Sequence, residues 1–452
     1  MGLHLTVLHR MAYTYTQQMF CLSALTDLVG YFSGDATTLT QQAEALIQSI
    51  LQDDESSGLI GDWEVVWGPV AWPEQTVMVL RFDGPLAQMF QSQYVVALSG
   101  SQSTHWKQWL SHDDSLQVQE PWPYLPQAYG GDLEPQIASG LGRCLQCVLH
   151  DMKPHHLQPG AELSLVELMT TMATELPEPA SITVAGHGLG GTLAAGIGLA
   201  LQDLQVEGPN GAGWDPKQQC RIATYLSGNP TPGNADFAYY FESVLGASSQ
   251  RLWNKLDVVP YAWQTDAIML SSFLYAPYIA PNDFIQILTG FSLEKVKMLE
   301  DPYCQLLPHT PPLPGQLNHT LLDGLKIENR LGEEDMKLLT GVTAQIFAAY
   351  KPKPSQQELP FGRINPEELA QTVQSLLIPW LGDPTGEQLR NTMSALHADM
   401  QELLNELWEE IEKLLLYLIQ LIYQHTEAYH HLLGTRDFAR LLRRHLIKVR
   451  SN

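Results

Sequence analysis

The segment SITVAGHGLGGTLA, residues 181–194, decides the fold of this chain. It begins with β-branched and small apolar residues, turns at a cluster of glycines, and continues with small residues that favour a helix. Two chemistries use a strand, a tight glycine-rich turn and a helix in this order: dinucleotide binding and nucleophilic catalysis. The sequence on either side of the segment must decide between them.

The dinucleotide reading rests on Gly186, Gly188 and Gly191, which satisfy the pattern G-x-G-x-x-G. That fingerprint also needs an acidic residue at the end of a second strand about 20 residues further on. Here Asp203 and Glu207 lie in sequence typical of a helix and a loop. A dinucleotide-binding oxidoreductase is therefore a distant alternative.

The second reading is a nucleophile elbow, whose pattern is G-x-S-x-G. Residues 186–190 read Gly-His-Gly-Leu-Gly, so they fit this pattern except that Gly188 occupies the position of the serine. Glycine suits such a turn because, without a Cβ atom, it adopts unusual backbone angles at little cost. We expect His187 to be a packed, hydrogen-bonded turn residue.

Runs of β-branched residues alternate with helical sequence from about residue 90 to residue 260. The runs include VVALSG, SITVAG and CRIATYLSG, which begin at residues 95, 181 and 220. Strands that alternate with helices are typical of a mostly parallel sheet flanked by helices. The sequence therefore predicts an α/β fold.

Further segments resemble the class 3 (fungal-type) lipase family of the α/β-hydrolase superfamily. In addition to the elbow, these are VVALSGSQSTHWKQWLSHD (95–113), IASGLGRCLQCVL (137–149), TYLSGNPTPGNADFAYYF (224–241), RLWNKLDVVPYAW (251–263) and QHTEAYHHLLG (424–434). They occur in the order that the family shows. The resemblance implies an α/β-hydrolase with a large, mainly helical lid or cap insertion.

The resemblance also implies a Ser-Asp-His mechanism. Gly188 stands at the nucleophile position, Asp257 matches the triad acid and His425 matches the triad histidine. His319 and His309 are alternative triad histidines, because they lie nearer to Asp257 in the sequence.

The oxyanion hole of such an enzyme needs two backbone N–H groups directed at the developing charge. Leu189, directly after the nucleophile position, would supply one of them. Ser101 matches the family's second donor, and Gly100 before it permits a close approach of the backbone. Ser99 departs from the arginine that is usual at its position.

We therefore predict a lipase or carboxylic ester hydrolase that acts on lipid acyl esters but is inactive as written, because Gly188 has no nucleophilic atom. An engineered Ser→Gly replacement is the favoured explanation, since the rest of the matched site is intact. The alternative is a natural lipase-like pseudoenzyme that binds a lipid or a protein partner.

Four regions are expected. Residues 1–90 form an N-terminal helix and the first strands, and residues 91–264 form the hydrolase core. Residues 265–420 form the lid or cap insertion, in which Ala267 to Gly290 is either a mobile lid or a buried cap. Residues 421–452 lead back to the core and carry the triad histidine and a basic tail.

A long amphipathic helix is predicted within the insertion. Residues 387–433 contain neither Pro nor Gly, and their apolar residues recur at spacings of three and four. We expect this helix to be broken at most once and to end at Gly434.

The charge and the cysteine content argue against a nucleic-acid partner and against a disulfide-rich protein. The net charge of −24 disfavours a nucleic-acid partner. Five scattered cysteines form no disulfide framework, and we expect neither a cofactor nor a metal.

We predict the cellular location from the lack of long apolar runs in the sequence. Residues 1–32 contain no apolar core of a signal peptide, and prolines interrupt Ala267 to Gly290. We expect no transmembrane helix, and a location in the cytoplasm or export without a cleavable signal peptide. The basic segment 435–452 is expected to dock on the acidic body of the chain, with transient contact to a membrane or lipid interface as the alternative.

Overall fold

The computed structural model describes two parts of the chain. The first is residues 12–319, except 33, 73–74, 84–91, 101–116, 127–130, 176–178, 209–210 and 298. The second comprises residues 344, 346–350, 365, 367–369, 371–373, 375, 391 and 393–450.

A twisted sheet forms the centre of the molecule, with its strands in the order β1-β2-β3-β6-β9-β10. Its strands are β1 (Trp63–Trp72), β2 (Gln75–Phe82), β3 (Ser92–Leu98), β6 (Ala180–His187), β9 (Cys220–Ser227) and β10 (Ser249–Leu252). The last four run parallel, whereas β1 and β2 pair antiparallel at one edge. The predicted α/β fold with a mostly parallel sheet is therefore confirmed.

Both faces of this sheet are buried, and alternation along β3 shows why. Val96 and Leu98 pack into the core on one face, whereas Val95 and Ala97 pack into the core on the other. Successive side chains of a strand point to opposite faces, so a strand buried on both sides needs an unbroken apolar run.

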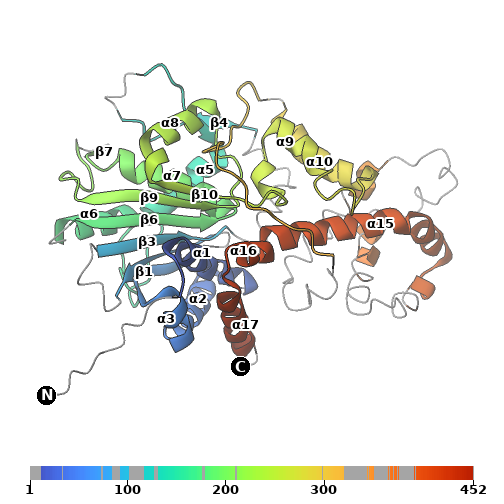
Figure 1. Ribbon diagram of the computed structural model, residues 1–452, viewed down its shortest axis with the longest axis horizontal. Coiled ribbons are helices and arrows are strands. Elements are labelled where there is room, and N and C mark those ends of the chain that lie inside the picture. The colour runs from blue at the N-terminus through green and yellow to red at the C-terminus, as the bar shows by residue number, and fades with distance from the viewer. Residues whose placement is uncertain are drawn as a thin grey trace.

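Helices cover the two faces as separate layers (Figure 1). One face carries α5 (Ser139–Gln146), η3 (Cys147–Asp151), α6 (Leu165–Glu175), α7 (Leu189–Asp203) and α8 (Ala235–Leu245). The other carries α1 (Tyr15–Thr26), η1 (Asp27–Tyr31), α2 (Ala36–Leu51), α3 (Asp54–Ile60) and α17 (Arg436–Arg450). Short elements complete the body: β4 (Gln119–Pro121), β5 (Gln136–Ala138), β7 (Glu207–Gly208), β8 (Gly211–Ala212), η4 (Gly246–Ser248) and η5 (Val259–Tyr261).

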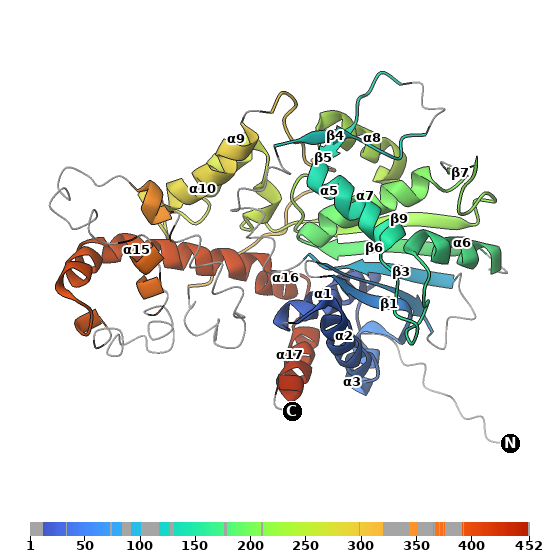
Figure 2. The same cartoon turned by 180° about the vertical axis from the view of Figure 1, so that it is seen from behind.

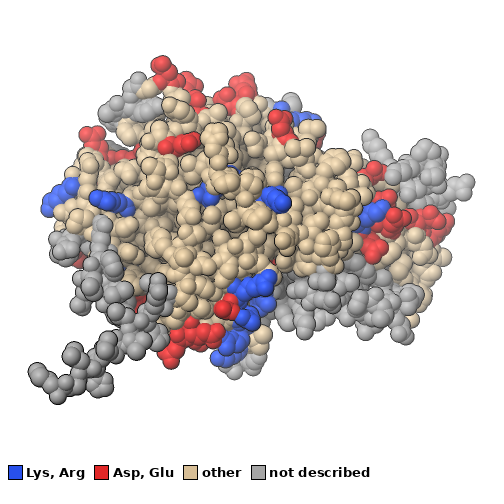
Figure 3. All heavy atoms as spheres, viewed as in Figure 1, with Lys and Arg blue, Asp and Glu red and all other residues tan. Residues whose placement is uncertain are grey.

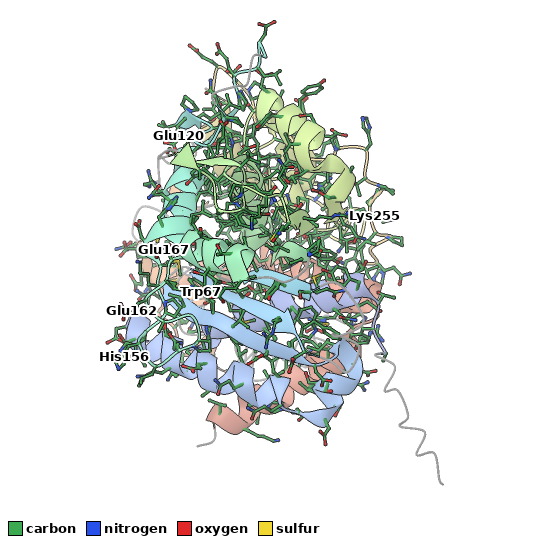
Figure 4. All side chains as sticks on the ribbon, turned by 90° about the vertical axis from the view of Figure 1, so that its left-hand side faces the viewer. Trp67, Glu120, His156, Glu162, Glu167 and Lys255 are labelled. Carbon is green, nitrogen blue, oxygen red and sulfur yellow. The ribbon has the colours of Figure 1, made fainter. Side chains whose placement is uncertain are left out.

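The loop before α6 packs against the sheet at its β1 edge. The Trp67 indole N–H donates to the Leu163 carbonyl at 2.8 Å, and Gly160 lies against the same indole ring. Figure 4 shows Trp67 beside Glu162 at this edge, with Lys255 at the opposite side of the view.

The insertion builds a helical cap with its own core. Its helices include α9 (Thr265–Ser271), α10 (Asp283–Val296) and α15 (Ala398–His425), and α15 extends away from the sheet (Figures 1 and 2). Leu403, Leu407 and Ile411 of α15 are buried in one cluster with Phe284 and Leu288 of α10. The predicted mainly helical cap is confirmed by these elements.

The helix predicted over residues 387–433 is interrupted twice in the described residues, so the expectation of at most one break is wrong. Residues 393 and 394 are helical, but His397 is extended, with φ −71° and ψ 160°, and α15 begins only at Ala398. Thr426 leaves the helical conformation, with φ −117° and ψ −82°, and separates α15 from α16 (Glu427–Leu432). Gly434 then adopts a positive φ of 72°, in accord with its predicted role as the stop.

The basic tail docks on the body of the chain. Phe438 and Leu441 of α17 are fully buried, and Arg444 forms an ion pair with Glu55. His445 Nε2 lies 3.0 Å from Asp53 Oδ2. Figure 3 shows the cluster of cations over α17 directly beside acidic residues. In the part of the chain that the structure describes, no helix is both long and apolar enough to cross a membrane.

Candidate active site

The elbow and two further loops meet at the carboxyl ends of parallel strands β6, β9 and β10. β6 ends at His187, β9 ends at Ser227, and the turn after β10 carries Asp257. In open α/β sheets, this edge is where ligands bind.

Gly188 forms the elbow itself, between the last residue of β6 and the first residue of α7. Its φ is 59° and its ψ is −129°, in a region that L-amino acids rarely adopt. Its N–H donates to the Ser227 carbonyl at 2.8 Å, and its own carbonyl accepts from the Gly191 N–H at 3.0 Å. The predicted sharp turn between strand and helix is present.

The flanking glycines let the backbone segments approach each other. A Cβ atom on Gly186 would lie 2.1 Å from the Gly190 carbonyl oxygen. One on Gly190 would lie 2.5 Å from the Leu98 carbonyl oxygen and 2.7 Å from the Gly100 nitrogen. The glycine pattern is therefore explained by close contact of α7 with the end of β6 and with the end of β3.

Asp257 and His425, which are 168 residues apart, form a buried hydrogen-bonded pair. His425 Nδ1 lies 2.8 Å from Asp257 Oδ2, and Asp257 Oδ1 accepts from the Val259 N–H at 3.0 Å. A carboxylate that accepts at Nδ1 leaves Nε2 as the nitrogen that can exchange a proton with a reacting group.

The two alternative histidines lie elsewhere. His309 and His319 are both exposed, and His319 packs its ring edge-on against Tyr278. The carboxylate of Asp257 bonds to His425 instead.

Tyr429 is a member of the site that the sequence reasoning missed. Its hydroxyl donates to Asp257 Oδ2 at 2.8 Å and accepts from the Asn254 N–H at 3.1 Å. Burial, reinforced by the Asp257 carboxylate, raises the pKa of Tyr429 well above its usual value. The signal was present, because Tyr429 lies within the matched segment QHTEAYHHLLG.

His187 packs against His425, with the two rings stacked and their centroids 4.6 Å apart. Its Nε2 lies 2.6 Å from the His425 carbonyl oxygen, so Nε2 carries the proton. Its Nδ1 lies 2.7 Å from Ser227 Oγ and, in the neutral ring, accepts from that hydroxyl. His187 is thus the packed, hydrogen-bonded residue that was expected.

The candidate oxyanion donors are only partly covered by the structure. Leu189 is the first residue of α7, directly after Gly188. Ser101 lies outside the described residues. Gly100, which precedes it, packs directly against Gly190.

Asp27 reaches this region from the N-terminal helices. The Gly100 N–H donates to its carboxyl group, and Oδ1 is buried without a hydrogen-bond partner among the described residues. Burial raises the pKa of Asp27 well above its usual range, although the Gly100 bond opposes the shift. No motif marked Asp27, because residues 1–90 match no segment of the family pattern.

Metal ligands do not gather at this edge of the sheet. Within the described residues, no group of three or more His, Cys, Asp or Glu could hold a metal ion.

Comparisons with known proteins agree with this geometry. Residues 95–266 match the family model of lipase (class 3), a range that includes the elbow and Asp257 but not His425. The structure is similar to that of M37 lipase, with 27% identity and a TM-score of 0.56 over 68% of this chain and 88% of that one. Residues 95–266 thus match the class 3 lipase family, and the α/β fold is similar to that of a lipase, in agreement with the resemblance noted from the sequence.

Two fungal lipases are more distantly similar. Lipase II from Rhizopus niveus has 16% identity and a TM-score of 0.37, covering 56% of this chain and 76% of that one. The Rhizomucor miehei lipase propeptide complex has 16% identity and a TM-score of 0.34, covering 54% and 62%. No curated protein matches the chain.

Replacement of Gly190 by alanine tests the close approach of α7 to β3. We expect Gly190→Ala to destabilise the fold by about 1–3 kcal/mol, because its Cβ meets backbone atoms that cannot rotate away. Urea unfolding measures the change. Gly58→Ala in α3 is the matched control, since nothing lies within 4 Å of its Cβ, and it should be neutral or slightly stabilising. Equal destabilisation by both variants would contradict this account.

Replacement of Asp27 by asparagine tests its neutral state. Because the folded pKa is raised, Asp27 contributes stability below its unfolded pKa of about 4 that is lost as pH rises through the folded pKa. Asparagine cannot ionise, so the Tm of Asp27→Asn relative to the parent should increase from pH 5 to pH 8. Asp35→Asn is the control, because the pKa of exposed Asp35 is lowered by hydrogen bonds to Thr38. Its Tm difference should stay constant over that range, and a constant difference for Asp27→Asn would refute the assignment.

Proposed function

We propose that this chain, with its class 3 lipase segment, is a lipid ester hydrolase of the Ser-Asp-His type that is inactive as written because Gly188 replaces the nucleophile. The observation that carries the proposal is the buried pair of His425 and Asp257, 2.8 Å apart, at the strand ends beside a nucleophile-elbow turn. A buried His–Asp pair beside such a turn is the proton-transfer half of an acyl-transfer site.

With a serine at position 188, the mechanism follows from the positions of these groups. The serine hydroxyl attacks the ester carbonyl, and His425 Nε2 takes its proton. Asp257 holds the imidazole in the required tautomer and stabilises the imidazolium that forms. The N–H groups of Leu189 and Ser101, which the resemblance assigns, receive the oxyanion. As the intermediate collapses, the ester C–O bond breaks and the leaving alcohol takes the proton from His425 Nε2. Water, deprotonated by His425, then attacks the acyl-serine and releases the carboxylic acid.

Glycine at position 188 removes the attacking atom but leaves the partners in place. Loss of a triad serine costs on the order of 10⁶-fold in rate. Asp257 nevertheless keeps its hydrogen bonds to both His425 and Tyr429. An unused site need not keep such partners. This supports an engineered Ser→Gly over a natural lipase-like pseudoenzyme, and the native codon at position 188 decides between them.

Restoring the nucleophile tests the function. We expect Gly188→Ser to increase hydrolysis of p-nitrophenyl esters by several orders of magnitude, up to about 10⁶-fold. Added to that variant, His425→Ala should return the rate to that of the glycine chain. His319→Ala should keep the restored rate, because His319 is exposed and packs against Tyr278, whereas Asp257 bonds to His425.

Two results would count against the hydrolase. A folded Gly188→Ser protein with no turnover of esters of any chain length would favour the pseudoenzyme. Measurable affinity for a nicotinamide or flavin nucleotide would revive the dinucleotide reading.

The same substitution should carry a cost in stability. At φ 59° and ψ −129°, a serine is strained whereas glycine is not, so Gly188→Ser should lower the free energy of unfolding by about 1–3 kcal/mol. Thermal and urea unfolding of the two chains measure this difference. An unchanged or higher stability of the serine chain would show that the elbow relaxes around a side chain.

A further inference from the structure

The carboxyl group of Asp27 reaches the nucleophile elbow from the N-terminal helices. Asp27 is the first residue of η1, directly after α1, and the Gly100 N–H donates to its carboxyl group. A Cβ atom on Gly190 would lie 2.7 Å from the same Gly100 nitrogen. Gly190 is the second residue of α7, two residues after Gly188. Gly100 therefore contacts both the Asp27 carboxyl group and the turn that would carry the nucleophile.

The two oxygens of this carboxyl group have different surroundings. One of them accepts the hydrogen bond from Gly100. The other, Oδ1, is fully enclosed although Asp27 as a whole is half-buried, and it has no hydrogen-bond partner among the described residues. Buried polar atoms without a partner are uncommon in folded proteins, and a catalytic role is one of the few explanations for them. The environment of Oδ1 therefore indicates a partner that the described residues do not supply.

Asp27 is a neutral carboxylic acid in this environment. Burial raises the pKa of Asp27 well above its usual range, and the Gly100 bond only partly opposes the rise. η1 packs on α1 and α2, and the titratable side chains of those two helices are Tyr15, Cys21 and Glu44. None of these is among the causes of the pKa shift, and residues 98–100 and 188–190 on the facing side have no titratable side chain. Since the other oxygen accepts from Gly100, the proton belongs on Oδ1.

The hydroxyl of this acid lies among the groups that would bind the oxyanion. Under the proposed function, the donors are the N–H groups of Leu189 and Ser101. Leu189 directly precedes Gly190, which packs against Gly100, and Ser101 directly follows Gly100 in the chain. A buried carboxylic acid that stays neutral can donate a hydrogen bond to an oxyanion, whereas a carboxylate would repel it.

From these observations we propose that Asp27 is a further oxyanion donor, which adds an O–H bond from Oδ1 to the two N–H bonds. The inference rests on the proposed function, because the oxyanion forms only when a nucleophile at position 188 attacks an ester carbonyl. As the C=O double bond becomes a single bond, negative charge develops on its oxygen and the hydrogen bond from Asp27 strengthens. Asp27 keeps its proton throughout, so the proton transfers remain with His425.

Paired substitutions in the full-length Gly188→Ser chain test the donor with a soluble p-nitrophenyl ester. Asp27→Asn should keep kcat within about tenfold, because the amide oxygen accepts from Gly100 and the amide N–H replaces the O–H. Asp27→Leu should lower kcat by about 100-fold or more with little change in KM, since the lost bond is strong only in the transition state. Asp27→Ala takes its place if the leucine chain does not fold.

Asp203→Leu is the matched control for removal of a buried carboxyl group. Asp203 lies at the opposite end of α7 from the elbow, and burial raises its pKa to about 7. The Trp122 indole N–H and the Tyr240 hydroxyl donate to it. This variant should lose stability but keep the kcat of the Gly188→Ser chain. Equal losses of kcat in Asp203→Leu and Asp27→Leu would overturn the proposal.

The pH dependence separates donation from mere positioning of Gly100. Loss of the proton removes the O–H but leaves an oxygen that still accepts from Gly100. The difference infrared spectrum between the glycine chain and its Asp27→Asn variant should contain a carboxylic acid band at pH 7. As pH rises, the kcat of the Gly188→Ser chain relative to its Asp27→Asn variant should fall only where that band gives way to a carboxylate band. A carboxylate band at pH 7, or a relative kcat that ignores the conversion, would refute the donor.

Failure of the proposed function is distinguishable from failure of this inference. If Gly188→Ser hydrolyses esters but Asp27→Asn is as slow as Asp27→Leu, the hydrolase stands and the Asp27 donor fails. If Gly188→Ser turns over no ester although the infrared spectrum shows a neutral Asp27, the hydrolase fails and the donor fails with it.

Discussion

The rest of the site depends on the buried carboxylate of Asp257, whose side chain has no solvent exposure. A buried charge is tolerated only when hydrogen bonds compensate for its lost hydration. Here the compensation comes from His425, Tyr429 and the Val259 N–H. Removal of any one of these donors would leave part of the carboxylate uncompensated. Because these donors must surround the Asp257 carboxylate, the turn after β10, the end of α15 and α16 are held close together. The same hydrogen bonds fix the orientation of the His425 ring.

This dependence makes the cap part of the site. α15 spans the core of the cap and ends at His425, while Asn254 bonds to the Gln424 side chain at 2.7 Å. The Gln424 amide in turn donates to the Gln316 carbonyl at 2.7 Å. A displacement of the cap would therefore move the histidine relative to the elbow. Residues of the cap thus influence the geometry of the site, because Asp257 and His425 come from different structural units.

The elbow imposes the opposite constraint, because it favours the residue that abolishes the proposed chemistry. A positive φ at position 188 strains every side chain, so glycine is the residue that the backbone accepts most readily. A catalytic serine is held there against that preference, at a cost that the surrounding sheet and helix must offset. With glycine, the chain has the fold, the carboxylate network and the packing of His187, and under the proposed function it lacks the attacking atom.

The family resemblance favoured His425 but left His309 and His319 open, and only the folded structure pairs His425 with Asp257. The sequence alone determined the parallel sheet, the elbow and the helical cap. These features follow from local periodicity and from motifs whose residues are close together in the chain. Tyr429 lay within a matched motif, but only tertiary packing shows its bond to Asp257. The role of Asp27 could not be predicted, because it depends on Gly100, which is distant in the sequence. The exposed side of α9 could not be predicted either, because the packing of that helix depends on Tyr417 and on the core of the cap. Local patterns encode elements, whereas burial and hydrogen-bond partners exist only once the chain has folded.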